Sequence, residues 1–524
     1  MLMIDTTKQY DTIIIGGGHN GLTCAFYLAK AGKKVLVLEA SQQVGGGCST
    51  SVFHDQFSVS SCAQWLYQLN PKVTSDLKLN SHGLEIAAKD LSTIALSEDG
   101  DHLTMNGDIL SGAGVSDEDC AAYKKFNTQF KKFAKFLSSA FDRRPPKLVE
   151  NNWLDRITAL KLGLGMKLMG KADMQDLMRL ALINIYDVME ENFDNKLLKA
   201  AISLDAVLGT HMGPRSPNTV YSYLYKKTGE IFGYNGPSLP KGGMGSITKA
   251  IAKSAQSVGV EIMTGKRVQN INLDLDKVTG ITLEGGEIIS SEIVVSNADP
   301  RTTHYDLIGK KNLETGTVRR VRGVRMQGNA AKLHLALDSL PSFKGLTKDQ
   351  MGQRLVIAPT MKYIEDAFNA CKYGDFSEKP ALDISIPSIH DSSLAPDGKH
   401  VMSVIVQYAP CKLNSGWDIA KNDFKEIIID RIRDFAPDIR DKILHSELLT
   451  PADLENRHLN YGGHWHHGEI SLDQILMMRP FPGSSQYKTV IDGVFLCGAG
   501  SHPGGGVMGL AGHNAAKEII RSSK

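Results

Sequence analysis

Near the start of the chain, the apolar positions follow the order strand, glycine turn, helix, strand. The runs Asp11–Ile15 and Val35–Glu39 are almost wholly apolar, as strands are in a sheet that is buried on both faces. Between them, Leu22–Ala31 has the apolar spacing of a helix. The pattern therefore predicts a βαβ unit.

The pattern changes to helical spacing from Asp117 to about Asn235. One apolar stripe in this region is formed by Phe126, Phe130, Phe133, Leu137 and Phe141. We predict an inserted, mainly helical lobe here.

Strand-like runs return after residue 258. They are Val260–Met263, Val268–Leu273, Gly280–Leu283 and Glu292–Ser296, and they follow a helical run at Ile247–Ala255. Residues 328–454 mix β-rich runs with one amphipathic helix, and Gly493–Lys524 repeats the order strand, glycine loop, helix. Since 524 residues exceed the usual size of one domain, we expect two or more lobes.

A glycine motif joins the first strand to the first helix. Gly16, Gly18 and Gly21 form G-x-G-x-x-G, and Glu39 ends the second strand. The first glycine permits a tight turn, the second lets backbone N–H groups approach a pyrophosphate, and the third lets helix and strand pack closely. Glu39 is placed to accept hydrogen bonds from adenosine ribose hydroxyls, and its charge disfavours NADP. The unit is predicted to bind the ADP half of a dinucleotide.

Two further features favour FAD over NAD as that dinucleotide. Gly45 and Gly46 would let the chain pass over the dinucleotide without side-chain clashes, although an ordinary flexible loop is the alternative. The glycine-rich run Gly493–Gly509 precedes a helix that starts near Leu510. The N-terminus of that helix could face the N1–C2=O region of a flavin, which gains negative charge on reduction.

The composition excludes several other classes of protein. A formal net charge of +2, with 42% apolar and 22% charged residues, gives no general attraction to nucleic acid. The seven cysteines form no C-x-x-C pair, which disfavours a zinc ribbon and a redox-active disulfide and indicates reduced thiols. Met1–Tyr10 holds no apolar secretory segment, and no apolar run is long enough to span a membrane, so we expect a cytoplasmic protein.

Five motifs resemble those of one flavoprotein family. They are G-G-G-H-N-G at Gly16–Gly21, P-K-G-G-M-G at Pro240–Gly245, V-V-S-N-A-D-P at Val294–Pro300, H-G-E-I-S-L-D-Q at His467–Gln474 and G-A-G-S-H-P-G-G-G at Gly498–Gly506. Together they resemble the phytoene desaturase-related branch of the FAD-dependent amine oxidase superfamily. Within it, the chain is most similar to the group of pyridine nucleotide-disulfide oxidoreductase domain-containing protein 2.

The resemblance implies which residues contact a noncovalently bound FAD. They are Gly16, Gly18, Gly21, Glu39, Gly46, Val268, Gly498, Gly500 and Met508, with Val268 acting through its backbone near the adenine. The chain departs from the family at Gly47-Cys48, where many members have an arginine that makes a charge contact to the diphosphate.

The expected fold is α/β, with a Rossmann-type (glutathione reductase-like) FAD-binding domain and an inserted α+β substrate domain. We assign residues 1–80, 238–310 and 455–524 to the FAD-binding domain, and residues 81–237 and 311–454 to the substrate domain.

Three residues are candidates for a direct part in the chemistry. Lys332 lies in an apolar, strand-like run, where an ammonium group is costly without a partner. The resemblance implies a lysine bridged by water to the flavin, and a salt-bridged or snorkelling lysine is the equal alternative. His467 follows His464 and His466, and His502 lies in the terminal glycine loop. We interpret His467 and His502 as facing flavin or substrate and expect no metal, because no carboxylate–histidine signature accompanies them.

A basic, Phe-rich region has two interpretations. Ala121–Lys147 contains eight Lys or Arg against one Asp, interleaved with five Phe, and Trp153–Lys171 adds a second basic helix with an apolar face. Such helices can lie on an anionic membrane surface with the apolar face buried, which would make the protein a peripheral membrane protein. The alternative is a lobe that packs its Phe stripe inward.

The function expected from this resemblance is that of an FAD-dependent oxidoreductase of the phytoene desaturase type. It would transfer hydride between a long apolar, isoprenoid or lipid-like substrate and flavin N5. One alternative is an amine oxidase, which tends to need an aromatic cage where this chain offers His502 and Pro503. Another is a flavin-bearing scaffold with little catalysis.

Overall fold

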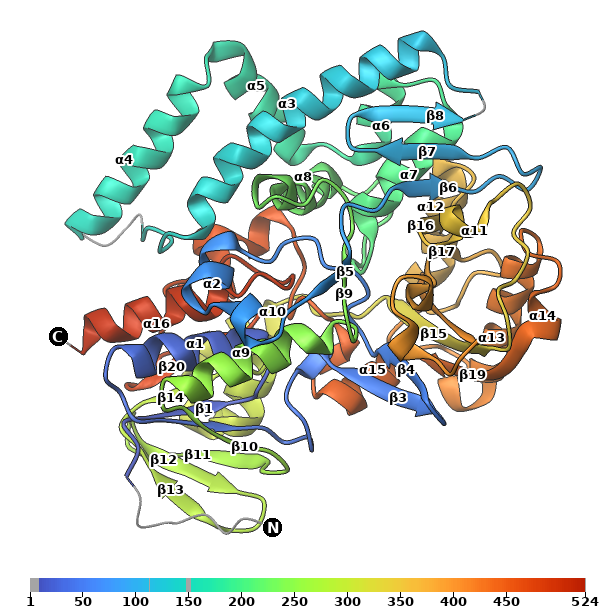
Figure 1. Cartoon of the computed structure of the whole chain (residues 1–524). Coiled ribbons are helices and arrows are strands. Elements are labelled where there is room, and N and C mark those ends of the chain that lie inside the picture. Colours follow the sequence, from blue (N-terminus) through green and yellow to red (C-terminus); the bar gives the residue numbers. More distant parts are fainter. Residues whose placement is uncertain (1–8, 113, 148–151, 524) are drawn as a thin grey trace.

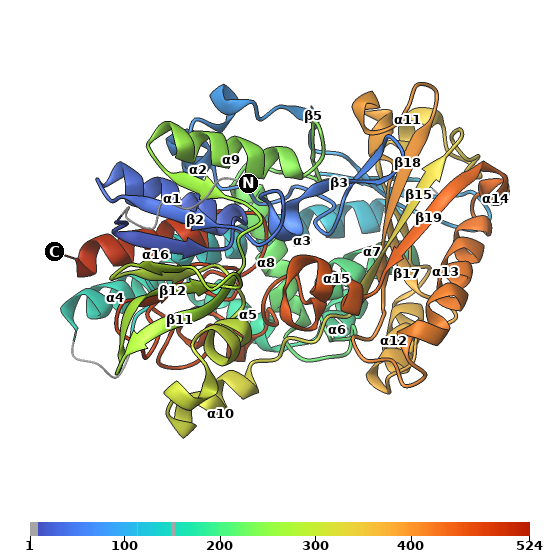
Figure 2. The ribbon, with the colours of Figure 1, turned by 90° about the horizontal axis from the view of Figure 1, so that it is seen from below.

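The computed structural model describes residues 9–112, 114–147 and 152–523 of the chain. Most of Met1–Tyr10, for which no secretory signal is predicted, lies outside the described residues. The chain forms two large sheets toward opposite ends of the molecule, with helices between and around them (Figure 1, Figure 2).

The first sheet is parallel and has five strands in the order β10-β2-β1-β14-β20. In that order, the strands are Glu261–Met263, Val35–Leu38, Thr12–Ile15, Val294–Ser296 and Val494–Leu496. Segments from the start, the middle and the end of the chain thus lie side by side. The predicted Rossmann-type α/β fold is confirmed.

Helices cover one face of this sheet, and a β-meander covers the other (Figure 1). The helices are α1 (His19–Lys30), α9 (Gly245–Ser257) and α16 (Leu510–Ser522), and the meander is β11 (Val268–Asp274), β12 (Lys277–Leu283) and β13 (Ile288–Ser290). Because side chains alternate along a strand, Ile14 of β1 packs with the helices while Ile13 and Ile15 pack with the meander. This burial on both faces explains the continuous apolar run in β1.

The helix α1 begins at His19, whereas the apolar spacing predicts a start at Leu22. Gly18 is its N-cap residue, so the glycine motif itself forms the first turn. The early start was not visible in the spacing, because the motif holds no apolar side chains.

The second sheet has eight strands in the order β19-β15-β18-β17-β16-β6-β7-β8. Its strands are β6 (Thr93–Ala95), β7 (Leu103–Asn106), β8 (Ile109–Gly112), β15 (Ala330–Leu337), β16 (Arg354–Ile357), β17 (Ala381–Ser385), β18 (His400–Gln407) and β19 (Ile443–Leu449). Neighbouring strands are antiparallel except β16 and β6. The helix α13 (Trp417–Arg433) packs its apolar side chains Phe424, Ile428 and Ile432 on one face.

A helical lobe lies along one side of the molecule, at the top of Figure 1. It consists of α3 (Asp117–Phe141), α4 (Trp153–Leu168), α5 (Lys171–Leu182), α6 (Ile185–Asn192), α7 (Lys196–Val207) and α8 (Thr219–Ile231). The Phe stripe of α3 is buried in the core, where Phe126 and Phe130 contact Tyr223 of α8. The alternative in which this stripe lies in a bilayer is therefore wrong, because its side chains already have protein partners.

The remaining strands and α-helices lie outside these groups. They are β3 (Thr50–His54), β4 (Phe57–Ser60), β5 (Ile86–Ala88), β9 (Leu239–Pro240), α2 (Pro71–Asp76), α10 (Thr315–Gly323), α11 (Lys348–Met351), α12 (Met361–Lys372), α14 (Ile439–Lys442) and α15 (Pro451–His458). Across the three described ranges, none of the helices combines the length and apolar character that a membrane crossing requires.

Candidate active site

A cavity of about 520 Å³ extends from the parallel sheet to the eight-stranded sheet. One end is lined by the loops after β1, β2 and β14, represented by Gly18, Glu39 and Asn297. Ligands of α/β proteins bind at the carboxyl ends of parallel strands, which is where these loops lie. We call this part the cofactor end of the cavity.

The glycine motif brings the backbone to the cofactor end. Gly16 and Gly18 line the cavity, and a Cβ atom on Gly18 would lie 2.7 Å from Asn297 Nδ2. Gly21 does not line it and packs α1 against the preceding strand, since a Cβ atom there would lie 2.3 Å from the Gly16 carbonyl oxygen. Gly46 has φ of +53° and crosses the motif, with a Cβ atom there 3.8 Å from Gly18 Cα.

Glu39 is buried at the end of β2 and lines the same end of the cavity. Its Oε2 accepts a hydrogen bond from Gly17 N at 2.7 Å, and its Oε1 accepts one from Ser41 N at 2.8 Å. These bonds hold the carboxylate beside the glycine motif with lone pairs left for a ribose. Val268, the first residue of β11, also lines this end.

The C-terminal glycine loop reaches the cavity through residues other than those predicted. Ala499, Gly506 and Val507 line the cavity, whereas Gly498, Gly500 and Met508 do not. Gly498 and Gly500 instead permit close packing: a Cβ atom on either would lie 2.5 Å from Asn297 O or Pro300 Cδ, respectively. Their contact with a dinucleotide stays a prediction.

The other part of the cavity, which we call the substrate end, is lined by side chains from several elements. They are Gln64, Trp65, Tyr67, Gln68, Asp205, Thr210, Ser222, Tyr225, Lys226, Ile405, Trp465, His466, His467 and Ile470. Lys226 donates to Asp205 Oδ1 at 2.6 Å, and its ammonium group lies 4.3 Å from the centre of the Tyr67 ring. Burial, together with the charge of Arg354, lowers the pKa of Lys226 to about 8.

A buried ion-pair network supports this substrate end. Arg354 of β16 donates to Asp383 Oδ2 at 2.9 Å and to Asp205 Oδ1 at 2.7 Å. Asp383 Oδ1 in turn accepts from Trp65 Nε1 at 2.9 Å and from Gln64 Nε2 at 3.3 Å. The network therefore fixes two cavity-lining side chains to the eight-stranded sheet.

Lys332 lies behind the cavity wall. It is fully buried on β15, and its ammonium group donates to Gln64 Oε1 and Ser403 Oγ. Burial lowers its pKa to about 7. Neither the snorkelling nor the salt-bridged alternative holds, because the ammonium group is buried and bonds to neutral oxygens. Of its two hydrogen-bond partners, Gln64 lines the cavity and Ser403 does not.

The two candidate histidines lie in different surroundings. His467 lines the cavity, and burial lowers its pKa to about 4. His502 lies away from the cavity, with its Nε2 3.0 Å from the Ala140 carbonyl oxygen, and burial lowers its pKa to about 4 as well. In the described ranges, no group of three or more His, Cys, Asp or Glu is arranged to hold a metal ion.

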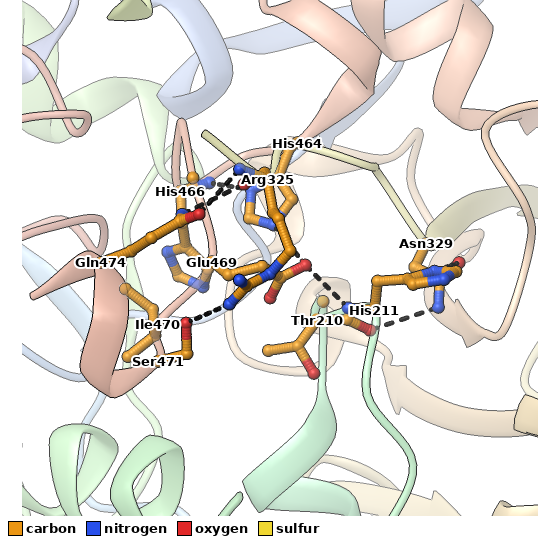
Figure 3. A network of polar contacts seen from close by, with 12 residues as sticks. Thr210, His211, Arg325, Asn329, His464, His466, Glu469, Ile470, Ser471 and Gln474 are labelled. Carbon is orange, nitrogen blue, oxygen red and sulfur yellow. Dashed lines mark hydrogen bonds and ion pairs between the residues drawn. The ribbon is translucent and has the colours of Figure 1, made fainter. Parts of the chain in front are cut away.

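A polar network holds the loop that carries His466, His467 and Ile470 (Figure 3). Glu469 Oε1 accepts from His211 N at 2.9 Å, and Gln474 Oε1 accepts from Arg325 N at 2.7 Å. These contacts join the loop to the segment after α7 and to the segment that leads into β15. The network keeps the cavity wall in place.

The sequence pattern did not identify Arg479, which also organises this loop. Its guanidinium group is fully buried and donates to five backbone carbonyl groups, those of His466, Gly468, Glu469, Gln474 and Ala499. It thus joins the loop to the C-terminal glycine loop. The sequence feature that could have indicated a buried arginine is its place between apolar neighbours, in the run Met477–Phe481.

Two family models match the chain. One, described as an NAD(P)-binding Rossmann-like domain, covers residues 14–78, and the other, described as flavin containing amine oxidoreductase, covers residues 126–520. The first contains the glycine motif, Glu39 and the Gln64–Gln68 part of the substrate end, and the second contains the other residues of the substrate end.

Individual proteins are similar to the chain over nearly its full length. Pyridine nucleotide-disulfide oxidoreductase domain-containing protein 2 of Mus musculus is 32% identical over 547 aligned positions, which cover 98% of this chain and 94% of the mouse protein. A lycopene-forming phytoene desaturase of Pantoea ananas is 24% identical, with 96% of each chain covered. A solved structure of putrescine oxidase bound to putrescine superposes with a TM-score of 0.64 at 12% identity, covering 98% of this chain and 99% of that one.

Proposed function

We propose that this chain, which belongs to the family of flavin-containing amine oxidoreductases and is an FAD-dependent oxidoreductase, acts on a long apolar substrate. The proposed reaction is of the phytoene dehydrogenase or desaturase type, on an isoprenoid or lipid-like compound. Flavin, when bound, supplies hydride transfer at N5.

The cofactor end of the cavity fits the ADP half of FAD. Gly16, Gly18 and Gly46 leave room for a pyrophosphate beside the backbone, Glu39 can accept from the ribose, and Val268 would contact the adenine. The described geometry around Gly18 leaves no room for a larger residue there.

We further propose that FAD is held noncovalently, since no cysteine or histidine lies in a recognised flavin-linkage motif. Acid precipitation of the purified protein should then release the yellow colour into the supernatant. Colour that stays with the pellet would contradict this proposal.

The observation that carries the substrate proposal is the make-up of the substrate end. It adjoins the cofactor end in one cavity, and its walls include Trp65, Tyr225, Ile405, Trp465 and Ile470. Aromatic and aliphatic walls bind apolar molecules by excluding water. The lycopene-forming phytoene desaturase of Pantoea ananas, which aligns with 96% of this chain, supports this class of substrate.

An amine substrate is the second candidate. A carboxylate, Asp205, lines the substrate end and could attract an ammonium group. However, it already pairs with Lys226 and Arg354, so a further cation would meet two positive charges. The structure therefore favours a neutral substrate.

The test begins with purified protein, its visible spectrum and the lipids that co-purify with it. Under anaerobic conditions, an isoprenoid hydrocarbon such as phytoene should bleach the flavin, whereas putrescine and benzylamine should not. A Gly18→Val variant, expected to lack flavin, controls for bleaching by contaminants. Bleaching by amines alone would replace the proposal with amine oxidation, and bleaching by no donor would favour a flavin-bearing scaffold.

A further inference from the structure

The helix α4 turns its apolar side chains outward. Its exposed stripe consists of Trp153, Ile157, Leu160, Leu164 and Leu168, which are between 38% and 76% exposed. These positions recur every three or four residues and so lie on one face of the helix. On α5, Met178 and Leu182 are also more than half exposed. Both helices thus present unburied apolar side chains.

The orientation of α4 is fixed by contacts on its inner side. Asp155 is buried and forms an ion pair with Arg144, and a Cβ atom on Gly165 would lie 3.3 Å from the Phe136 ring of α3. The helix α5 is joined to α3 by an ion pair between Lys132 and Asp173. The stripe therefore cannot rotate inward without breaking these contacts. Figure 1 shows α4 at the edge of the molecule, away from both sheets.

The charges around the stripe are positive. Arg156, Lys161, Lys167 and Lys171 are exposed, whereas the one acidic residue of 152–171 is the buried, ion-paired Asp155. With about 3.6 residues per turn, Lys161 and Lys167 lie roughly 60° to either side of the stripe. Long basic side chains at such positions can reach past an apolar face toward anionic groups.

We propose that α4 lies in the headgroup region of an anionic lipid bilayer, with its stripe facing the acyl chains. An apolar face between two basic flanks is the pattern of an interfacial helix. A second copy of the chain would fit less well, because pairing two such faces would bring basic flanks together. Of the two basic helices that the sequence offers for a membrane surface, α4 and not α3 is then the one that faces the bilayer, whatever the substrate of the cavity is.

The direct experiment is co-sedimentation of the flavin-loaded full chain with lipid vesicles. Vesicles of phosphatidylcholine with phosphatidylglycerol should retain the protein at low salt, and phosphatidylcholine alone should retain little. A variant with Arg156, Lys161 and Lys167 all changed to Gln should bind the anionic vesicles roughly 100-fold more weakly, about fivefold per residue. This loss should shrink as salt screens the charges.

A second variant tests the stripe itself. Changing Leu160, Leu164 and Leu168 to Ser should lower vesicle binding at least about tenfold for each side chain that the bilayer buries. The matched control changes Val52, Ile109 and Leu275 to Ser, three apolar residues exposed elsewhere, and should bind as the unchanged protein does. Flavin content and Tm should be equal in all variants, which shows that they are folded.

The position of α4 can be read from Trp153, one of four tryptophans. Brominated lipid should quench part of the tryptophan fluorescence, and Trp153→Phe should remove that part. Equal binding to neutral and anionic vesicles at low salt, or quenching unchanged by Trp153→Phe, would overturn the proposal. So would a dimer in sedimentation equilibrium that the Leu→Ser variant dissociates while no vesicle retains the protein.

Discussion

The two ends of the cavity are built in different ways. The cofactor end is made of backbone, in loops after β1, β2 and β14 where Gly16, Gly18 and Gly46 carry no side chain. The substrate end is made of side chains such as Trp65 and Lys226, which come from distant parts of the sequence. Ligand binding at the cofactor end therefore depends on glycines that leave space beside the backbone. The shape of the substrate end depends instead on buried ion pairs that hold its side chains.

This difference determines how each end should fail. An added side chain at the cofactor end occupies the space of the ligand while the fold survives. A lost charge at the substrate end leaves its partner buried and unpaired, which costs stability of the whole protein. The following changes separate these two modes.

The largest effect is expected for Gly18→Val. Its branched side chain would enter the space of the pyrophosphate and crowd Asn297, so flavin binding should be abolished. The flavin absorbance of the purified variant measures this. Gly285→Val is the matched control, because a Cβ atom there meets nothing within 4 Å. Full flavin content in Gly18→Val would mean that the cofactor lies elsewhere.

The next effect concerns the substrate end. Arg354→Met should lower the free energy of unfolding by about 3–5 kcal/mol, because Asp383 and Asp205 lose a buried partner. Urea unfolding measures the change. Arg440→Met removes a solvent-exposed arginine with two acidic partners and should cost no more than about 1 kcal/mol. Similar losses in both variants would remove the contrast between buried and exposed pairs.

A smaller effect is expected for Glu39→Ala at the cofactor end. Losing a charge-assisted hydrogen bond to the ribose should weaken FAD binding by about 1.5–3 kcal/mol. The Kd for FAD, measured by titration of the apoprotein, reports this. The free energy of unfolding of the apoprotein serves as a control for loss of the Gly17 and Ser41 hydrogen bonds. An unchanged Kd would show that Glu39 does not contact the cofactor.

The smallest effect is a pH dependence that arises from Lys332. Its pKa is about 7 in the folded protein and near its ordinary value of 10.5 when unfolded. Between these values the unfolded chain binds more protons, so stability should rise with pH by up to about 1.4 kcal/mol per unit. Below pH 7 both states are protonated and the contribution is flat.

Lys332→Met provides the comparison for this slope. Urea unfolding of both proteins between pH 7 and pH 9 should show a rise in the unchanged protein that the variant lacks. Parallel pH profiles would mean that Lys332 keeps its proton in the folded state.

The cofactor end could be predicted from sequence to a large extent. Gly16, Gly18, Glu39, Gly46 and Val268 all line the cavity, and their contact with FAD, which the motif and the resemblance imply, stays a prediction. A tight turn and a close approach of the backbone to a ligand require glycine, so the glycines in a short stretch of sequence are enough to predict them. The C-terminal loop was placed correctly as a segment, but its lining residues, Ala499, Gly506 and Val507, depend on how the loop folds back.

The substrate end was hidden from sequence analysis. Asp383 and Gln64 are 319 positions apart, and the residues next to them in the sequence do not predict the hydrogen bond between them. Lys332 stood out as a charge in an apolar run, yet its partners Gln64 and Ser403 come from a distant loop and a neighbouring strand. Arg479 likewise satisfies its donors with carbonyl groups that only the folded loop brings together.

By itself, the sequence determined the parallel sheet, the glycine motif and the FAD-dependent class of chemistry, because these rest on patterns that neighbouring residues share. It also showed that α3 and α4 each have an apolar face and basic side chains. Only the tertiary structure decided that the face of α3 is buried while that of α4 is exposed. The physical reason is that amphipathic spacing predicts that one face of a helix will be buried. Whether that face packs on the protein core or on another surface depends on which other elements lie against the helix.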